Sequence, residues 1–343
     1  MYAGNASAIT VTELRTTGNL GGSMTAAYGV ANGNWTVAGE AELSNGERHA
    51  YFDHSNDGSG MVDLGTLGGT ASLAWDYEMN TTFDGGYVAG SSLLSNNDWH
   101  AFVCEDDGTP SLVDLGTLGG NYSWAWGVNS SGQVVGVSSI STGDHRAFLY
   151  SGGTMINLGT LGGGGSSAQG ISASGVVAGY SSTSGGDFHA FSYSGGTMTD
   201  LGTLGGASSF AYAIDDSGGI AGCSTLSTGE ERAFLYTGGT MHDLGTLSGD
   251  YGSCALALNN TGEVVGYSYY GSASERAFIY SGGTMYDLND LASSYMSDGV
   301  TTPGFIRLAF AQGINDWGYI VGYGDYFDGT TITTQAFVLG YAN

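Results

Sequence analysis

One phrase recurs along this chain of 343 residues and limits its possible folds more than any other feature. A basic residue precedes Ala-Phe, a Gly-Gly turn follows, and the phrase ends in Asp-Leu-Gly-Thr-Leu-Gly-Gly, as in residues 189–206. The Ala–aromatic element occurs seven times, starting at Ala50, Ala101, Ala147, Ala190, Ala233, Ala277 and Ala336. A repeat of about 43 residues is one unit that buries its faces against its neighbours. We therefore expect a single repeat domain over residues 1–343.

Each repeat has the pattern of four short strands. In residues 167–206, apolar runs are separated by a turn at Ala173–Gly175, a polar loop at Ser181–Asp187 and the pair Gly195-Gly196. Adjacent glycines allow the positive φ that a two-residue hairpin loop requires. Four antiparallel strands in about 43 residues have the dimensions of a propeller blade. The sequence predicts an all-β protein, a seven-bladed β-propeller of four-stranded antiparallel blades.

The two ends of the repeat array predict how the ring closes. The last repeat stops after its third strand, at Ala336–Leu339, whereas an additional strand, Ile9–Leu14, precedes the first repeat. We expect this N-terminal strand to complete the last blade, which would remove the open sheet edges. The seven repeats then cover about 23–340 and contain one long insertion, Asp290–Arg307. Insertions of that length in compact domains are typically functional or mobile.

Charge limits the range of partners. The chain has 32 acidic residues against 6 basic ones, all of them Arg, and a net charge of −26. An acidic chain without a basic stripe argues against nucleic acid and anionic membranes as partners. The sequence has no run of 18 apolar residues, so we expect no membrane insertion. A surface of Ser, Thr, Asn and Gly is typical of secreted and cell-surface proteins.

The cysteines do not indicate a disulfide framework. Cys104, Cys223 and Cys254 are odd in number, lack CxxC spacing, and two of them occupy different positions in the repeat. We therefore interpret all three as small buried residues and expect neither a disulfide nor a zinc site.

The repeated motif is similar to one known family. The phrases His100-Ala-Phe and His189-Ala-Phe, with the Asp-Leu-Gly-Thr-Leu-Gly-Gly runs, resemble the HAF family of probable extracellular repeats over roughly residues 10–340. The resemblance implies an exported or cell-surface protein and no established activity. The chain departs from the motif where His is replaced, at Arg146, Arg232, Arg276 and Gln335.

The residue before Ala-Phe is expected to pair with the acid of the next strand. In the Gly195-Gly196 hairpin Phe191 should lie opposite Asp200, which brings His189 within reach of that acid. The same spacing pairs His49 with Asp63, His100 with Asp114, Arg232 with Asp243 and Arg276 with Asp287; it also places Arg146 opposite Asn157 and Gln335 opposite Glu13. A ring of histidine metal ligands is the alternative, but Arg cannot be a ligand at neutral pH. We interpret the pairs as structural and expect no metal there.

Calcium is the one cofactor that the sequence raises. The segments 53–58 and 105–108 resemble pieces of oxygen-ligand loops, but neither is followed by the Glu of an EF-hand loop. Asp-Gly and Asn-Gly are also ordinary hairpin residues. We expect no cofactor, with calcium as the alternative.

Candidate binding residues occupy one variable position in the first strand of each repeat. This position lies between small residues, such as Ala125 and Gly127, and holds Tyr28, Trp75, Trp126, Gln169, Tyr212, Leu256 and Gln312. These side chains either fill space between blades or form a ligand-binding mouth near a central channel. We add Arg307 of the insertion to the binding candidates.

Two functions remain open. The first is a non-enzymatic extracellular or cell-surface propeller, a binding module or assembly unit whose partner is a glycan, a protein or a second copy of itself. The second is a polysaccharide-active lyase or hydrolase, which rests on analogy between propellers alone. The sequence contains no nucleophile elbow and no phosphate-binding loop. We therefore name no catalytic residues and favour the first function.

Overall fold

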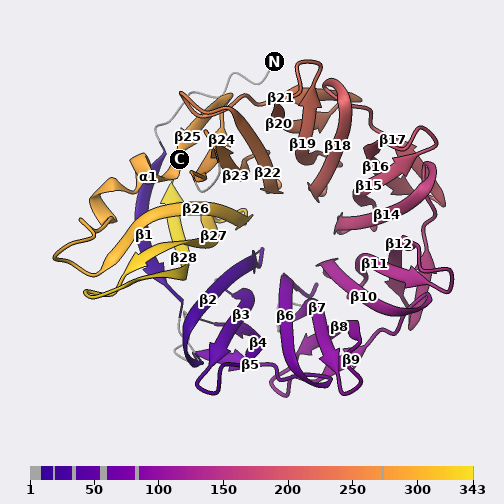
Figure 1. Cartoon of the computed structure of the whole chain (residues 1–343), viewed down its shortest axis with the longest axis horizontal. Helices are drawn as coiled ribbons and strands as arrows, with labels where there is room; N and C mark the ends of the chain where they lie inside the picture. The colour runs from indigo at the N-terminus through magenta and orange to yellow at the C-terminus, as the bar shows by residue number, and fades with distance from the viewer. Residues whose placement is uncertain are drawn as a thin grey trace.

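The computed structural model describes residues 9–17, 20–32, 36–54, 60–81, 85–271 and 274–342. Antiparallel sheets stand around a central axis, with their first strands innermost (Figure 1). The described helical segments are α1 (Leu288–Leu291) and a single 3-10 turn (Ser293–Tyr295). The prediction of an all-β propeller built from four-stranded antiparallel units is confirmed.

Four sheets follow the chain in simple order, and each has four strands. They are β10 (Gly119–Val128), β11 (Val134–Ile140), β12 (His145–Ser151) and β13 (Thr154–Asn157); β14 (Gly162–Ile171), β15 (Val177–Thr183), β16 (Phe188–Ser194) and β17 (Thr197–Asp200); β18 (Gly205–Ile214), β19 (Ile220–Leu226), β20 (Glu231–Thr237) and β21 (Thr240–Asp243); and β22 (Gly252–Leu258), β23 (Val264–Tyr269), β24 (Arg276–Ser281) and β25 (Thr284–Asp287).

An eight-stranded sheet contains two further groups of four strands. The groups are β2 (Gly21–Val30), β3 (Val37–Leu43), β4 (Arg48–Asp53) and β5 (Met61–Asp63), followed by β6 (Gly68–Met79), β7 (Gly86–Leu94), β8 (Trp99–Asp106) and β9 (Leu112–Asp114). One parallel bridge, between Arg48 and Ala71, joins the two groups. Within each group the pairing is antiparallel, as in the other sheets.

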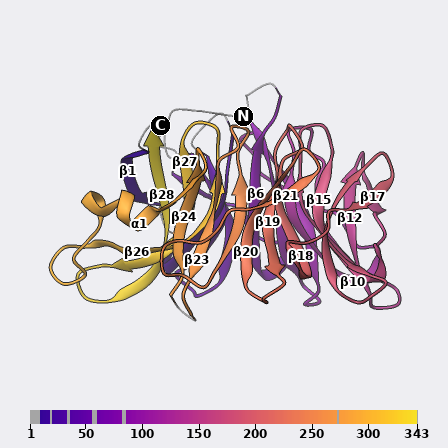
Figure 2. The same ribbon diagram turned by 90° about the horizontal axis from the view of Figure 1, so that it is seen from above.

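The remaining sheet joins the two ends of the described chain. Its strand order is β1 (Thr10–Thr16), β28 (Ile332–Ala342), β27 (Tyr319–Phe327) and β26 (Gly304–Ile314), and β1 is antiparallel to β28. The insertion packs beside this pairing, where Figure 2 shows α1 at the outer edge of the molecule. Ala292 of the insertion and Leu288 just before it are fully buried in one cluster with Val11, and the Tyr295 hydroxyl donates to the carbonyl of Thr12 at 3.1 Å. The described start of the insertion therefore supports the seam between the chain ends.

The repeated Ala–aromatic element forms the contact between neighbouring sheets. Phe191 and Ala190 are both 0% exposed, and so are their counterparts in the other repeats. One apolar cluster combines Phe191 and Ala168 with Ala147 and Leu158 of the preceding sheet, so that it draws on two neighbouring repeats. The motif recurs because each unit must present the same apolar faces to its neighbours.

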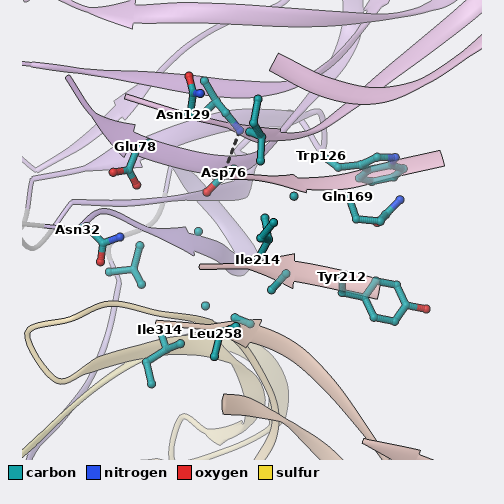
Figure 3. Close-up of a pocket in the computed structure, with 18 of the residues that line it drawn as sticks. Asn32, Asp76, Glu78, Trp126, Asn129, Gln169, Tyr212, Ile214, Leu258 and Ile314 are labelled. Atoms are coloured by element: carbon teal, nitrogen blue, oxygen red, sulfur yellow. Dashed lines mark hydrogen bonds between the residues drawn. The ribbon is translucent and has the colours of Figure 1, made fainter. Parts of the chain in front are cut away.

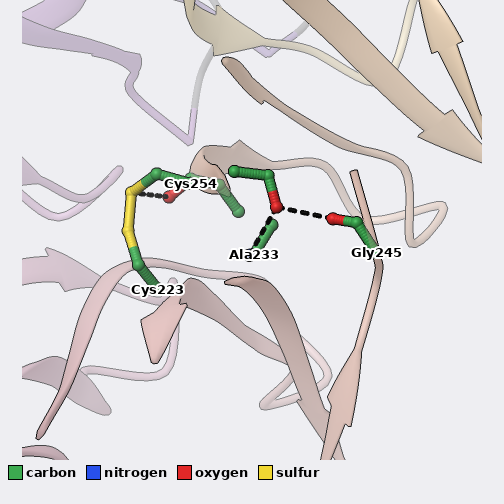
Figure 4. The surroundings of a disulfide bond; sticks show 6 residues. Cys223, Ala233, Gly245 and Cys254 are labelled. Atoms are coloured by element: carbon green, nitrogen blue, oxygen red, sulfur yellow. Dashed lines mark hydrogen bonds between the residues drawn. A yellow bond between two sulfur atoms is a disulfide. The ribbon is translucent and has the colours of Figure 1, made fainter. Parts of the chain in front are cut away.

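The glycine-rich phrase ties one sheet to the next through a serine (Figure 4). Asp243 accepts the N–H of Gly245 at 2.8 Å, which shapes the turn after β21. The Ser253 hydroxyl of the following sheet donates to the Gly245 carbonyl at 2.5 Å and accepts the Ala233 N–H at 2.9 Å. Ser72, Ser123, Ser166 and Ser209 make the same two bonds in earlier repeats.

The expectation of no disulfide is wrong. Cys223 of β19 and Cys254 of β22 form a disulfide across neighbouring sheets, with their Cα atoms 4.8 Å apart (Figure 4). Their different repeat positions are the reason that they meet, because β19 packs against β22 of the next sheet. Tyr180 and Phe210 hold the same two positions one repeat earlier, and their rings also touch, at 5.1 Å. Cys104 is the buried free cysteine of the described chain.

Among the described residues, no helix combines the length and apolar character needed to span a bilayer.

Candidate functional site: an aromatic channel with a carboxylate end

The variable side chains of the innermost strands converge on one central cavity of about 200 Å³. All seven of these positions line it: Tyr28, Trp75, Trp126, Gln169, Tyr212, Leu256 and Gln312. The ring centroids of Tyr28 and Trp75 are 4.5 Å apart, and those of Trp75 and Trp126 are 5.0 Å apart. Three aromatic side chains from consecutive repeats thus form one continuous wall of the channel.

Small residues beside these side chains let the innermost strands approach one another. A Cβ added at Gly29 would lie 2.9 Å from the Cα of Asp76, and one added at Gly313 would lie 2.9 Å from the Tyr28 carbonyl oxygen. Such distances exclude a side chain unless the backbone moves. Asp76 itself departs from the expected pattern, because it occupies the position that is Gly or Ala in the other repeats.

Two buried donors in this wall lack partners. The Nε1 atoms of Trp75 and Trp126 have no hydrogen-bond partner in the described part of the chain. Tyr28 differs, since its hydroxyl donates to Glu40 at 2.8 Å. Burial, together with the charge of Glu40, holds the pKa of Tyr28 well above its usual range, so this phenol stays protonated. Buried indole N–H groups usually find an acceptor, which marks the channel as a place for polar ligand atoms.

The opposite end of the channel carries carboxylates (Figure 3). Asp76 accepts the backbone N–H of Val128 at 3.0 Å, and Glu78 lies two residues further along β6. Burial raises the pKa of Asp76 to about 6 despite that hydrogen bond. Burial also raises the pKa of Glu78 to about 8, with smaller contributions from Asp76, Asp216 and Asp316. Glu78 is therefore largely protonated at neutral pH.

Side chains of Asp and Asn link neighbouring repeats around this end. Asp216 accepts the N–H of Ala173 at 2.8 Å, and Asn260 accepts the N–H of Asp216 at 2.9 Å. The series continues from Asn260 to Asp316 at 2.7 Å and from Asp316 to Asn32 at 3.1 Å. These bonds hold the carboxylates of Asp216 and Asp316 near Glu78, and that proximity contributes to its raised pKa.

The expected structural pairs divide into two kinds. His49 contacts Asp63 at 2.8 Å, His100 contacts Asp114 at 2.8 Å, His189 contacts Asp200 at 2.8 Å, and Arg276 contacts Asp287 at 2.7 Å. The pair Arg232–Asp243 is absent from the described contacts. Arg232 instead donates to the Tyr251 carbonyl of the next repeat at 2.8 Å.

Two of the other repeats that lack His at this position behave like Arg232. Arg146 donates to the Gly164 carbonyl of the following repeat, and Gln335 of the last repeat donates to the Ser23 carbonyl of the first repeat at 2.8 Å. The register does place Asn157 opposite Phe148, as expected, but Arg146 makes no contact with Asn157 among the described residues. The expectation for Glu13 is wrong, because Glu13 pairs with Gly340 and Phe337 pairs with Thr16 in the β1–β28 register. The three histidines contact an acid of their own blade, as Arg276 does, whereas Arg146, Arg232 and Gln335 bond to a carbonyl of a neighbouring blade.

Arg307 does not join the channel residues. Its Nε donates to Asp325 at 2.8 Å, and its Nη1 lies 3.8 Å from Glu275 of the preceding repeat. The guanidinium holds β26 to β27 and to the neighbouring sheet, so the inclusion of Arg307 among the binding candidates has no support in its position.

The segments considered for calcium make local contacts. In 105–108, Asp106 is buried and accepts the Tyr77 hydroxyl at 2.7 Å, while Asp107 accepts the N–H of Thr109 at 2.9 Å. Much of the other segment, residues 55–59, lies outside the described residues. Over the described chain, Cys223, Glu231 and Cys254 are the group whose three ligand atoms lie within 4.8 Å of one another. Because both sulfur atoms are in the disulfide, no thiolate is available there.

Sequence reasoning found the channel wall but missed its carboxylate end. Asp76 and Glu78 carried a usable signal, since Asp76 interrupts a column of Gly and Ala across the repeats. A charged residue at a position that is otherwise small is a departure that an alignment of the repeats exposes.

Comparisons with known proteins identify the fold alone. No family model matches the chain, and no curated protein matches it, so the resemblance to HAF repeats stays a prediction. Solved structures do match. The WD40 repeats of RRP9 superpose with a TM-score of 0.55 at 9% identity, covering 97% of this chain and 99% of that one.

Two hydrolases are also similar. A puromycin hydrolase matches with a TM-score of 0.58 at 11% identity, covering 92% of this chain and 52% of the hydrolase. The acylaminoacyl peptidase of Pyrococcus horikoshii matches with a TM-score of 0.51 at 10% identity, covering 91% of this chain and 52% of the peptidase. The chain thus spans about half the length of either hydrolase. At these identities the likeness concerns the propeller fold.

Proposed function

We propose that this protein is a non-enzymatic binding module that takes a neutral glycan into its central channel. The single observation that carries the proposal is the pair of buried, unpartnered indole N–H groups of Trp75 and Trp126. They lie in a continuous aromatic wall. Aromatic faces bind the C–H faces of a sugar ring, and the N–H groups have hydroxyl oxygens as natural acceptors. The proposed binding needs no cofactor.

The charge of the channel favours a neutral ligand. Its titratable lining residues are acids and tyrosines, and none of the described lining residues is Arg or His. The chain as a whole carries a net charge of −26. An acidic polysaccharide or nucleic acid would be repelled before it reached the channel. Gln169 and Gln312, which also line the channel, supply neutral donors and acceptors for hydroxyl groups.

We propose further that the protein works outside the cell or at its surface. The disulfide between Cys223 and Cys254 supports this, because disulfides persist in oxidising compartments and are rare where thiols are kept reduced. The acidic, Lys-free composition and the resemblance to probable extracellular repeats agree with it.

We also infer that the ring has seven blades, with β1 completing the last. Five four-stranded sheets and the two four-stranded halves of the eight-stranded sheet support that number. The β1–β28 pairing and the Tyr295 contact to β1 support closure of the seam.

A polysaccharide-active enzyme is the second candidate, and one observation favours it. Asp76 and Glu78 are carboxyl groups with raised pKa values in a concave site, the property expected of a general acid. They lie at the end of the channel away from the aromatic wall, and Asp76 is held by the N–H of Val128. Binding therefore remains the favoured function.

A glycan array tests the proposal. Wild-type protein should bind neutral oligosaccharides, and Trp75→Ala and Trp126→Ala should each weaken that binding at least tenfold. Trp317→Ala is the matched control, because Trp317 is 59% exposed and does not line the channel. Equal binding by wild type and both channel variants would overturn the proposal. Turnover of a bound glycan that is abolished by Glu78→Gln would establish the enzyme instead.

A further inference from the structure

A second cavity lies away from the channel, where the turn between β7 and β8 meets the start of β10. Six residues line it: Asn97, Asp98, Trp99, Asn121, Tyr122 and Trp124. It is an open groove between two neighbouring repeats. It shares no lining residue with the central channel, although Trp124 of the groove also stacks on Trp126 of the channel wall, with centroids 5.9 Å apart.

The turn that borders this groove departs from the rest of the repeats. Gly46, Gly143, Gly186 and Gly229 occupy the corresponding position in four other repeats, with φ of 85°, 90°, 98° and 96°. Here the residue is Asn97, with φ of 67°, and it is the one non-glycine residue with positive φ in the described chain. The turn hydrogen bond is unchanged, with Asn97 N–H to Leu94 carbonyl at 3.0 Å against 2.9 Å from Gly46 to Leu43.

The exchange of Gly for Asn is unfavourable for the backbone and adds a side chain. A left-handed conformation costs a residue with a Cβ more than it costs glycine, although Asn tolerates it better than most. The exposed Asn97 amide has no hydrogen-bond partner among the described residues, so it does not stabilise the turn in return. The penalty is small for Asn, and the side-chain amide that replaces the glycine hydrogen borders the groove.

An aromatic pair forms the floor of the groove. Trp99 stacks on Trp124 of the next repeat, with centroids 4.8 Å apart and an angle of 21° between the rings. Phe188 and Phe210 hold the same two positions in later repeats and also stack, with centroids 5.9 Å apart. The residue that corresponds to Trp99 is Arg48, His145 or Glu231 in other repeats, so a stack of two indoles is particular to this groove. Both indoles are half-buried, which leaves part of a rigid aromatic surface in contact with solvent.

The chemistry around the stack selects the ligand. Asn97 and Asn121 offer amide donors and acceptors, and Asp98 offers a carboxylate, one oxygen of which accepts the Asn96 amide at 2.8 Å. No Arg or His is among the groove's lining residues, so a negatively charged ligand finds no counter-charge. Six residues make far too small a surface for a standard protein interface.

We propose that this groove is a second carbohydrate site, which binds one neutral pyranose ring at the end or along the side of a glycan. The C–H face of the sugar packs on Trp99 and Trp124. Its hydroxyl groups donate to Asp98 and exchange hydrogen bonds with the amides of Asn97 and Asn121. A flat aromatic surface bordered by a few polar side chains is the general form of a small polar-ligand site.

The test compares three variants on a glycan array printed with neutral hexose oligosaccharides and with uronic-acid oligosaccharides. Trp99→Ala should lose at least tenfold in affinity for one set of neutral glycans. Asn97→Gly should weaken the same set about threefold or more while its melting temperature equals or exceeds that of wild type, because it restores the glycine of the other repeats. Trp317→Ala, which removes an exposed tryptophan of the Asn315–Gly318 turn, should leave the set unchanged.

Identical array profiles for wild type, Trp99→Ala and Asn97→Gly would overturn the proposal that the groove binds a glycan. Loss confined to uronic-acid glycans would also overturn it. Glycans that are lost in Trp75→Ala but retained in Trp99→Ala belong to the channel. This comparison keeps the two sites separate, and Asn97→Gly keeps the test decisive if Trp99→Ala does not fold.

Discussion

Replacing Glu78 by Gln should stabilise the protein at alkaline pH and leave it unchanged at acidic pH. The pKa of Glu78 rises from 4.5 to about 8 in the folded chain, chiefly through burial and then through Asp76, Asp216 and Asp316. A group with a raised folded pKa gives its full stabilisation below the unfolded value. That contribution is lost as the pH rises through about 8, when a carboxylate must form beside other carboxylates.

The size of the pKa shift of Glu78 determines how much Glu78→Gln should stabilise the protein. Each pKa unit corresponds to about 1.4 kcal/mol, so the full shift would be worth roughly 5 kcal/mol. Glu78 lines a channel and keeps some solvent contact, and we reduce the figure to about 2 kcal/mol for screening. For a chain of 343 residues the unfolding entropy is roughly 0.7 kcal/mol/K, so Glu78→Gln should melt about 3 °C above wild type at pH 9. At pH 4 the two should melt together.

Differential scanning calorimetry between pH 4 and pH 9 measures this difference. Glu105→Gln is the matched control, because Glu105 is exposed and its replacement removes one charge from the same acidic chain. The control separates burial of one carboxyl from general repulsion at a net charge of −26. An equal gain in both variants at pH 9, or a loss in Glu78→Gln, would refute the reasoning.

Three further predictions concern stability. Asp200→Ala should lower the free energy of unfolding in urea by about 1 kcal/mol, because it removes a half-exposed contact to His189 and the acceptor of the Gly202 N–H. Asp200→Asn should cost less, and no change in either variant would show that the pair contributes nothing. Cys223→Ser should lower the free energy of unfolding by about 3–4 kcal/mol under oxidising conditions, since the bridge closes a loop of 31 residues, and an identical effect under full reduction would contradict this. Deleting residues 1–16 should expose the edge of β28 and cause aggregation in light scattering, and a deleted protein that stays monodisperse would count against closure by β1.

The parts of the fold that repeat could be predicted from the sequence. A fixed period, Gly-Gly hairpins and β-branched runs predict four-stranded units. The spacing of Phe191 and Asp200 gave a register that the structure reproduces, with those two residues directly opposite. Repetition makes such inferences strong, because one local rule must hold in every copy.

Features that depend on contact between different repeat positions were not accessible in the same way. Cys223 and Cys254 hold unlike positions, and only the packing of β19 on β22 brings them together. The direction of Arg232 has the same origin, since its partner carbonyl belongs to Tyr251 of the next blade. Comparison within one repeat cannot show which side chains face each other across the boundary between blades.

In the candidate sites, residues that follow the repeat could be predicted from the sequence, whereas residues that depart from it could not. The channel wall was accessible because its residues share one strand position, as Trp75 and Trp126 do. Asp76, Glu78 and Asn97 were missed because each is an exception to the repeat, and a consensus removes exceptions. In a repeat protein, departures from the consensus are therefore where ligand-specific chemistry is best sought.

A crystal structure of the protein with the neutral oligosaccharide that binds it most tightly on the array tests the central claim most directly. The account predicts a sugar in the central channel, with its hydroxyl oxygens within hydrogen-bond distance of the Nε1 atoms of Trp75 and Trp126. A complex in which the bound glycan leaves both indole N–H groups uncontacted would contradict it.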